Sequence, residues 1–174
     1  MKIKVSLGNI DEAIKAIEQY EKSLEKKRKT FMERLAAIGV DTAKASFKTA
    51  KYDGDNDVIV NEPMWVNDNK LVFSATGKSV LFIEFGTGVH YSSVSHPKEA
   101  EFGFSRGTYG HGLGKLDSWR YEGNPGTNGE LITEGKHKGE VKTYGNPANR
   151  CMYEAGKEMR KQIKEIAKEV FSSD

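Results

Sequence analysis

IDEAIKAIEQYEKSLEKKRKTFMERLAAI, residues 10–38, is the longest periodic segment of the chain. Its apolar residues recur at intervals of three and four, with Glu21 and Arg28 in the two remaining slots of the pattern. This spacing predicts one long amphipathic helix, for which Asn9 is the expected N-cap. At about 1.5 Å per residue the helix would be about 40 Å long, so we expect part of it to project or to pack on a neighbour.

The residues that follow this helix predict a break, a loop and a hairpin. Gly39 predicts a bend or short break before further helix from Thr42 to Ala50. Residues 52–57, YDGDND, concentrate turn formers and predict a loop. The β-rich runs are Val58-Ile59-Val60, Trp65-Val66 and Leu71-Val72-Phe73, and the last two flank the turn Asn67-Asp68-Asn69.

The segment from Ser79 to Phe85, SVLFIEF, is a continuous apolar run. Such a run fits either a buried strand or a short buried helix, and a short helix is the favoured interpretation. Residues 88–145 then hold 12 of the 18 glycines and all four histidines, without a sustained period. They predict a glycine-rich extended loop region, in which residues 118–121, 131–133 and 141–144 are the expected strands.

The final segment predicts a second long helix. Asn146 is the expected N-cap and Pro147 the first helical residue, and an apolar stripe then continues to Phe171 over a helix of about 25 residues. The predicted fold class is therefore α+β, with a long N-terminal helix, a small antiparallel sheet, a glycine-rich extended loop region and a long C-terminal helix. We expect residues 1–174 to form a single domain with a loop-rich excursion at about 88–145.

Composition leaves the function open. The 174 residues include 27 Lys and Arg against 25 Asp and Glu, and the resulting formal charge of +2 is too weak to indicate a nucleic-acid partner. No apolar run reaches the roughly 20 residues that cross a bilayer, so no membrane contact is expected. Cys151 is the single cysteine, which excludes an intrachain disulfide and a zinc site of several cysteines.

Partial motifs for bound ions and nucleotides are all incomplete. Asp53, Asp55 and Asp57 have the alternate spacing of a calcium loop, but Met64 stands where the closing glutamate is required. The sequence Gly77-Lys78-Ser79 ends like a phosphate-binding loop that lacks its first glycine, and residues 86–90 lack the third glycine of a dinucleotide fingerprint. No metal or cofactor is expected.

Single reactive side chains give no enzyme mechanism. The four histidines lack the spacing of a metalloprotease and are interpreted as scattered surface residues, while Cys151 is expected to pack as a small apolar residue. Glu84 lies within an apolar run, where a carboxylate is costly unless it is paired. We therefore expect Glu84 to form a structural ion pair or to bind backbone N–H groups rather than to act as a catalytic acid.

Three stretches in this order, with a Trp-Arg-Tyr run at Trp119 before the last, carry a resemblance to a known family. They are AKYDGDNDVIV (residues 50–60), GKSVLFIEFGTGVH (residues 77–90) and TYGNPANRCMYEA (residues 143–155). The chain resembles the tailed-phage minor structural proteins of the gene-ten-product family, called tail-component, neck or head-tail joining proteins, over about residues 24–174. It departs from the commonest family pattern at residues 150–152 and in the length of its glycine-rich segment.

The resemblance implies signature residues in two segments and an assembly role without enzyme activity. The signature and structural residues are Glu84, Phe85, Gly86, Thr87, Gly88, Pro147 and Ala148, and the candidate oligomer contacts are Trp119, Tyr121, Met152 and Tyr153. Copies of such a protein form a ring, hexameric or of another number, in the neck of the virion between the portal vertex and the tail tube. The implied partners are itself, a phage head-closure or connector protein, a tail-terminator or tail-tube protein, and passing DNA without sequence specificity. The implied location is the virion neck, with the host cytoplasm during assembly of the phage or prophage particle.

Two rival interpretations come from other functional classes. A nucleic-acid-binding module would lay the basic stretch of the first helix along phosphates. Its residues would be Lys22, Lys26, Lys27, Arg28 and Lys29, although a solvated helix face is the simpler interpretation of this stretch. A hydrolase would use the loop that carries His90, His96 and His111, and only the histidines themselves support it.

Overall fold

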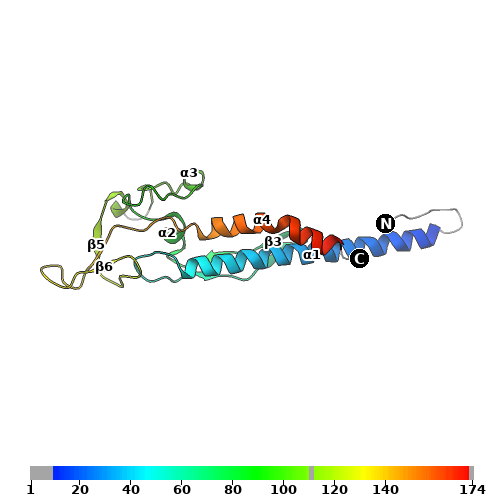
Figure 1. Ribbon diagram of the computed structural model, residues 1–174, viewed down its shortest axis with the longest axis horizontal. Coiled ribbons are helices and arrows are strands. Elements are labelled where there is room, and N and C mark those ends of the chain that lie inside the picture. The colour runs from blue at the N-terminus through cyan, green and yellow to red at the C-terminus, as the bar shows by residue number, and fades with distance from the viewer. Residues whose placement is uncertain (1–9, 110–111, 173–174) are drawn as a thin grey trace.

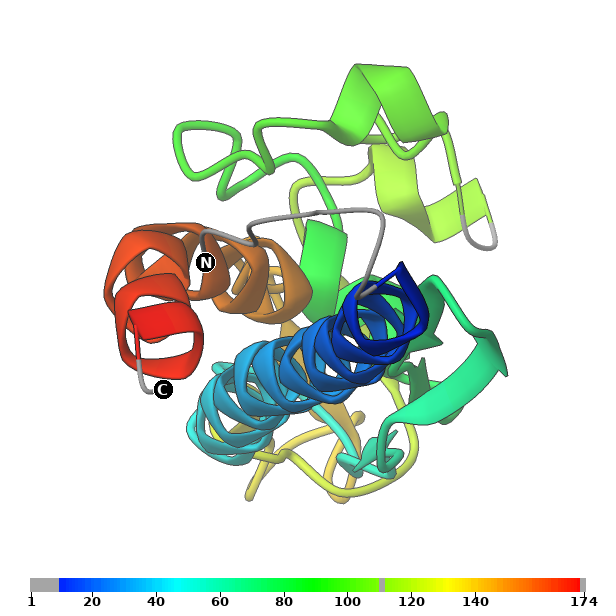
Figure 2. The ribbon, with the colours of Figure 1, turned by 90° about the vertical axis from the view of Figure 1, so that its right-hand side faces the viewer.

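The computed structural model describes residues 10–109 and 112–172, and its two long helices set the shape of the molecule. Helix α1 (Ile10–Lys48) and helix α4 (Cys151–Ser172) lie side by side and antiparallel, with the glycine-rich excursion gathered at one end (Figure 1). Viewed along the long axis, α4 and the β-hairpin lie on different sides of α1 (Figure 2). The predicted α+β class is confirmed.

Helix α1 runs through Gly39 without interruption, so the predicted bend or break at this residue is wrong. A Cβ atom on Gly39 would lie 2.6 Å from Sδ of Met159 in α4 and 2.8 Å from the ring of Phe73. The glycine therefore lets α4 and Phe73 approach the helix backbone closely. This packing offsets the cost of glycine in a helix interior, which is about 1 kcal/mol relative to alanine. The expected N-cap, Asn9, lies outside the described residues.

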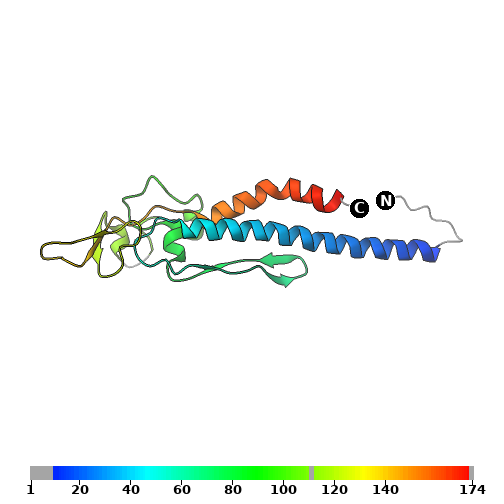
Figure 3. The same cartoon turned by 60° about the horizontal axis from the view of Figure 1, so that its bottom comes forward.

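The strands next to α1 form two short antiparallel pairs. Strand β2 (Met64–Asn67) pairs with β3 (Lys70–Val72), which confirms the predicted hairpin, and β1 (Ile59–Val60) pairs with β4 (Ala75–Thr76). Strand β4 was not predicted, because two residues are too few to show a period. Figure 3 shows the hairpin lying along α1.

The core lies where α1, α2 (Val80–Phe85) and α4 meet. Residues 80–85 are helical, so the interpretation of the segment 79–85 as a short helix rather than a strand is confirmed. The buried residues of this core are Val40, Ala43, Phe47, Ala50, Val60, Ile83, Cys151 and Ala155. Cys151 is fully buried, which confirms its expected packing role, and burial raises the pKa of its thiol to about 12.

The excursion is more ordered than an extended loop region. It contains helix α3 (Glu99–Phe102), a short 3₁₀ turn at Gly112–Lys115, and the strands β5 (Trp119–Tyr121), β6 (Glu130–Leu131) and β7 (Val141–Thr143). The three strands pair antiparallel in the order β5-β7-β6. The three expected strand positions are confirmed, whereas α3 and the 3₁₀ turn were missed because four residues are too short for a helical period.

Helix α4 begins at Cys151, four residues later than predicted, and has 22 residues. Asn146 and Pro147 resemble a helix start, but the Asn146 side-chain amide donates to the Phe82 carbonyl oxygen at 2.9 Å instead of capping α4. Arg150 then has a φ of +58°, which lies outside the helical region. A tertiary hydrogen bond has replaced the expected local one.

The three aspartates of the supposed calcium loop bind three separate partners. Asp53 accepts a hydrogen bond from the Thr143 hydroxyl, and Asp55 accepts one from Asn124 Nδ2 at 2.9 Å. Asp57 accepts from the Ser79 hydroxyl and from the backbone N–H groups of Lys78 at 2.8 Å and Ser79 at 2.9 Å. These donors hold the pKa of the Asp57 carboxyl down to about 2.

This lowered pKa predicts a loss of stability in acid. A carboxyl whose pKa is lower in the folded protein stabilises the fold above its ordinary pKa of 3.8, and the contribution disappears as pH falls toward about 2. The variant Asp57→Asn should therefore show a shallower fall in unfolding free energy between these two pH values, measured by urea denaturation. Ser79→Ala should give an intermediate slope because two backbone donors remain. Equal slopes in the parent protein and Asp57→Asn would contradict this prediction.

Candidate functional site

Glu84 joins α2 to the start of α4. Its buried carboxylate accepts hydrogen bonds from the backbone N–H groups of Met152 at 2.8 Å and Tyr153 at 3.0 Å. The first N–H groups of a helix have no partner within the helix, and the helix dipole favours negative charge at this end. Glu84 thus caps α4 from another helix, which confirms the prediction that backbone N–H groups hold it.

His96 completes the environment of this carboxylate. Its Nε2 lies 3.2 Å from Glu84 Oε1, and its Nδ1 accepts a hydrogen bond from the Lys98 backbone N–H at 3.0 Å. Because Nδ1 is an acceptor, the neutral ring carries its hydrogen on Nε2 and donates it to Glu84. The ring packs 4.4 Å from Phe85 and 5.3 Å from Tyr153, measured between centroids.

The interpretation of the histidines as scattered surface residues is wrong for His96, which is 3% exposed. Glu84 and two aromatic rings cover it, an arrangement that only the tertiary fold creates. His90 pairs with Asp117 at 3.1 Å and is exposed, as expected. His137 is partly exposed and lies 2.9 Å from Glu140, and His111 lies outside the described residues.

The signature residues 86–88 form the crossing point of two chain segments. Thr87 N–H donates to the Asn146 carbonyl oxygen at 3.0 Å, and the Asn146 N–H donates to the Thr87 hydroxyl oxygen at 3.0 Å. Gly86 has a φ of +79°, and a Cβ atom there would lie 2.7 Å from the backbone nitrogen of Ala148. Gly88 has a φ of +70° and lies against the ring of Trp119. Only glycine fits both the backbone angles and the close approach.

The segment 146–150 satisfies the carbonyl groups at the end of α2. The Asn149 side-chain amide donates to the Ile83 carbonyl oxygen at 3.1 Å, and the Arg150 N–H donates to the Glu84 carbonyl oxygen at 3.1 Å. Ala148 is buried, and its N–H donates to the Val94 carbonyl oxygen at 3.2 Å. The two signature segments, about 60 residues apart in sequence, therefore meet in one junction. We call residues 84–88 and 146–150 the α2–α4 junction.

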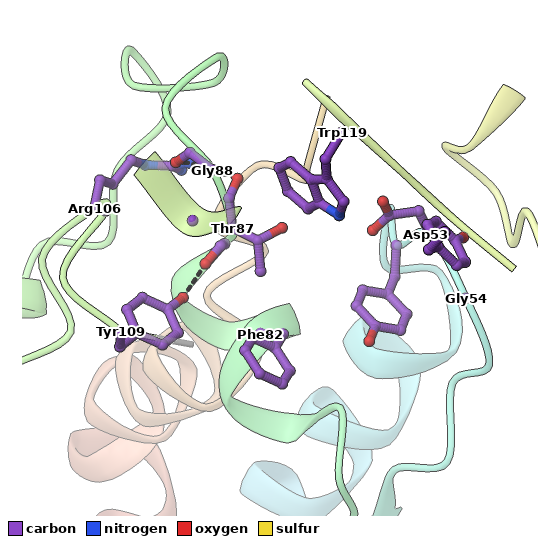
Figure 4. Close-up of a pocket in the computed structure, with 13 residues that line it drawn as sticks. Asp53, Gly54, Phe82, Thr87, Gly88, Arg106, Tyr109 and Trp119 are labelled. Carbon is purple, nitrogen blue, oxygen red and sulfur yellow. Dashed lines mark hydrogen bonds between the residues drawn. The ribbon is translucent and has the colours of Figure 1, made fainter. Parts of the chain in front are cut away.

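A cavity of about 300 Å³ lies beside this junction (Figure 4). Five aromatic side chains and five glycines contribute to its wall, so its surface combines ring faces with bare backbone. The lining residues are Tyr52, Asp53, Gly54, Phe82, Gly86, Thr87, Gly88, Arg106, Gly107, Tyr109, Gly114, Trp119 and Tyr121. The candidate oligomer contacts Trp119 and Tyr121 are thus among the residues that line it. We call it the aromatic cavity.

The two charged residues of the aromatic cavity lie on opposite sides of it (Figure 4). The guanidinium of Arg106 donates to the carbonyl oxygens of Val94 at 2.6 Å and Gly88 at 3.4 Å. The carboxyl of Asp53 is buried, and this burial raises its pKa. Burial next to Asp53 also raises the pKa of Tyr121 to about 12. Arg106 therefore forms hydrogen bonds with backbone carbonyl groups, while Asp53 is a carboxylic acid among the aromatic residues of the cavity wall.

A second cavity, of about 530 Å³, also borders the junction. Met152 and Tyr153, the remaining candidate oligomer contacts, line it together with the buried pair Glu84 and His96. Phe102, from α3, is 56% exposed beside it. The four candidate contacts thus divide into two pairs that border two different cavities.

Sequence reasoning missed several of these residues. Asn149, Arg106 and Tyr109 were not singled out, although Tyr109 donates a hydrogen bond from its hydroxyl to the Gly86 carbonyl oxygen. A usable signal was present, because aromatic residues in a glycine-rich polar segment must find cover elsewhere in the fold. The sequence could not show that this cover is the signature segment.

The basic stretch of α1 is only partly the solvated face that was expected. Lys26 is exposed, and the Lys29 ammonium lies 3.3 Å from the Glu25 carboxylate. Arg28 is half-buried, because its guanidinium donates to the Asn69 side chain in the turn of the hairpin. Part of this positive charge is thus used within the chain.

Residues 17–26 of α1 are all exposed, and the N-terminal part of this helix continues past the end of α4 (Figure 3). Large apolar side chains lie along this part of the helix and the turns before it. They are Ile10, Ile14, Ile17, Tyr20 and Leu24, each 38 to 49% exposed. We call these five residues the α1 apolar stripe.

Within residues 10–109 and 112–172, no group of three or more His, Cys, Asp or Glu side chains is placed to hold a metal ion. In the same part of the chain, no helix combines the length and the apolar character that crossing a bilayer requires. No protein-family model, curated protein or solved structure matches this chain.

Proposed function

We propose that this chain is a structural assembly protein of a tailed phage or prophage, which forms part of the head–tail connection around the DNA channel. It acts as one subunit of a neck ring or tail-completion ring. Its neighbours are further copies, a head-closure or connector protein, and a tail-terminator or tail-tube protein. The role needs no catalytic group, and the proposal draws on the residues that resemble the gene-ten-product family.

The α1 apolar stripe is the observation that carries this proposal. Helices in proteins are stabilised mainly by packing of an apolar face against a neighbour. Ile14 and Ile17 follow the three-and-four spacing of a helix-packing seam but are 49% and 46% exposed. Monomeric proteins rarely leave such contiguous patches in water. A neighbouring subunit that covers the stripe accounts for both the sequence pattern and the exposure.

The α2–α4 junction is the second observation that supports the proposal. Its two segments, distant in the sequence, bond directly to each other, because the Asn146 N–H donates to the Thr87 hydroxyl oxygen. The Glu84 carboxylate extends this contact to the first N–H groups of α4. Glu84, the one deeply buried carboxylate among the signature residues, caps a helix. The signature residues therefore hold α2 and α4 together, which suits a protein that must keep two binding surfaces at a fixed distance and orientation.

The native mass of the purified protein across a concentration range tests the proposal. Light scattering or native mass spectrometry should show a discrete closed oligomer, whose subunit number gives the ring symmetry. A monomer at the highest concentration reached would contradict self-assembly through this chain alone.

The double variant Ile14→Asp with Ile17→Asp should shift this oligomer to the monomer, because two carboxylates cannot be buried in an apolar seam. The fold should persist, since both side chains lie beyond α4. The matched control is Gln19→Asp with Ser23→Asp, which adds the same charge at two exposed positions outside the stripe and should leave the oligomer intact. An oligomer that survives the first variant unchanged would show that the stripe is not the interface.

A further inference from the structure

The volume and the lining residues of the aromatic cavity suit the binding of one side chain from another molecule. Its volume of about 300 Å³ lies at the lower end of the range for ligand pockets. The rings of Trp119 and Tyr121 reach it from β5, and Tyr52 reaches it from the loop after α1. The glycines of the wall leave room beside these rings.

The charge of the cavity favours a cation near these three rings. Asp53 is 9% exposed, and one of its carboxylate oxygens accepts the Thr143 hydroxyl. In Figure 4 the Asp53 carboxylate faces the indole of Trp119. Burial raises the pKa of Tyr52 and of Tyr121, and Asp53 and Asp55 raise both further, which indicates a second carboxylate close to the same rings. A buried carboxylate without a cation beside it is poorly solvated, and a cation would relieve that cost.

The positive charge of Arg106 does not fill this end of the cavity. Its guanidinium lies on the far side, with Thr87 and Trp119 between it and Asp53 (Figure 4). There it donates to the carbonyl oxygens of Val94 and Gly88. The acidic, aromatic end therefore has no cation of its own among the lining residues.

We propose that the aromatic cavity binds an arginine side chain presented by a partner protein, with Asp53 pairing to the guanidinium and the rings of Trp119 and Tyr121 packing on its plane. Arginine fits this wall better than lysine. Its planar guanidinium stacks on aromatic faces and can donate two parallel hydrogen bonds to a carboxylate. The proposal deepens the assembly role by naming the chemistry of a partner contact.

The two tryptophans of the chain allow a test at single-residue resolution. In a ¹H–¹⁵N spectrum of the full chain, Trp65 and Trp119 give two indole N–H signals, which the variant Trp65→Phe assigns. N-acetyl-arginine amide is the probe. The Trp119 signal should shift and saturate with added probe, while the Trp65 signal on the hairpin stays in place. N-acetyl-citrulline amide, which is neutral and of nearly the same shape, should bind at least about tenfold more weakly.

Two variants separate the acid from the rings. Asp53→Asn keeps the shape and the Thr143 hydrogen bond, and it should weaken the arginine probe about tenfold. Tyr121→Leu should weaken it severalfold by removing a ring face. Asp68→Asn removes the same charge in the hairpin turn and should leave binding unchanged. The Trp65 signal of each variant shows whether it is folded.

The outcomes either support or overturn the proposal. Saturation with the arginine probe, together with a weaker response to the citrulline probe and to Asp53→Asn, supports it. Equal shifts with both probes would mean a neutral apolar site and would overturn it, as would a Trp119 signal that neither probe moves. The titration does not depend on the oligomeric state, so its failure is distinct from a failure of the native-mass experiment.

Discussion

Glu84→Ala is expected to lower the free energy of unfolding by about 3 to 5 kcal/mol. The substitution removes the acceptor of the Met152 and Tyr153 N–H groups and the partner of His96. Glu84 and His96 are buried, and a buried donor without a partner costs about 1 to 3 kcal/mol. Urea denaturation followed by circular dichroism measures the loss.

Two further variants separate the carboxylate charge from a general effect of mutation. Glu84→Gln keeps the shape and one acceptor oxygen, so it should lose about half as much and remain measurable if the alanine variant does not fold. Glu62→Ala removes an exposed glutamate that pairs with Lys44 at 2.5 Å, and it should stay within about 0.5 kcal/mol of the parent. A Glu84→Ala variant as stable as Glu62→Ala would mean that the cap contributes little.

Gly145→Ala is expected to lower the free energy of unfolding by about 2 to 4 kcal/mol. Gly145 has a φ of +75°, and a Cβ atom there would lie 2.2 Å from the Thr87 carbonyl oxygen. Thr87 cannot move away cheaply, because its N–H and its hydroxyl are both bonded to Asn146. The alanine therefore adds a steric clash to the strain of a left-handed backbone.

Gly135→Ala is the matched control for this clash. Its φ of +81° imposes nearly the same backbone strain, but no atom lies within 4 Å of the added Cβ. It should cost about 1 kcal/mol, and the difference between the two variants measures the contact across the junction. Equal losses would show that the junction yields to the added methyl group.

The local elements of the fold could be predicted because their signals lie within a few residues of each other. The period of α1, the turn of the hairpin and the apolar run of α2 each follow from neighbouring side chains. The errors occurred where a distant contact replaced a local one. Asn146 has the residue type of a helix cap, but Phe82 takes its amide, and Gly39 has the residue type of a helix break, but Met159 and Phe73 occupy the space it leaves.

The candidate sites were predictable only in part for the same reason. Glu84 stood out because a carboxylate in an apolar run needs a partner, and the nature of that partner was anticipated. His96 gave no such signal, because its polar neighbours, such as Ser95 and Lys98, suggest a surface. The aromatic cavity draws its wall from four segments, which are the loop after α1, residues 82–88 of α2 and the turn after it, residues 106–114 of the excursion, and strand β5. A site assembled from four segments leaves no pattern at any single place in the sequence.

Because α1 is uninterrupted, it gives the chain a rigid element of fixed length. Its 39 residues span about 58 Å, and a straight helix without a hinge keeps that length under load. The α1 apolar stripe lies near the N-terminal end of the helix, and β5, which lines the aromatic cavity, lies beyond its C-terminal end (Figure 1). Molecules bound at these two places would be held a fixed distance apart, so in the proposed assembly the length of one helix sets the spacing between layers.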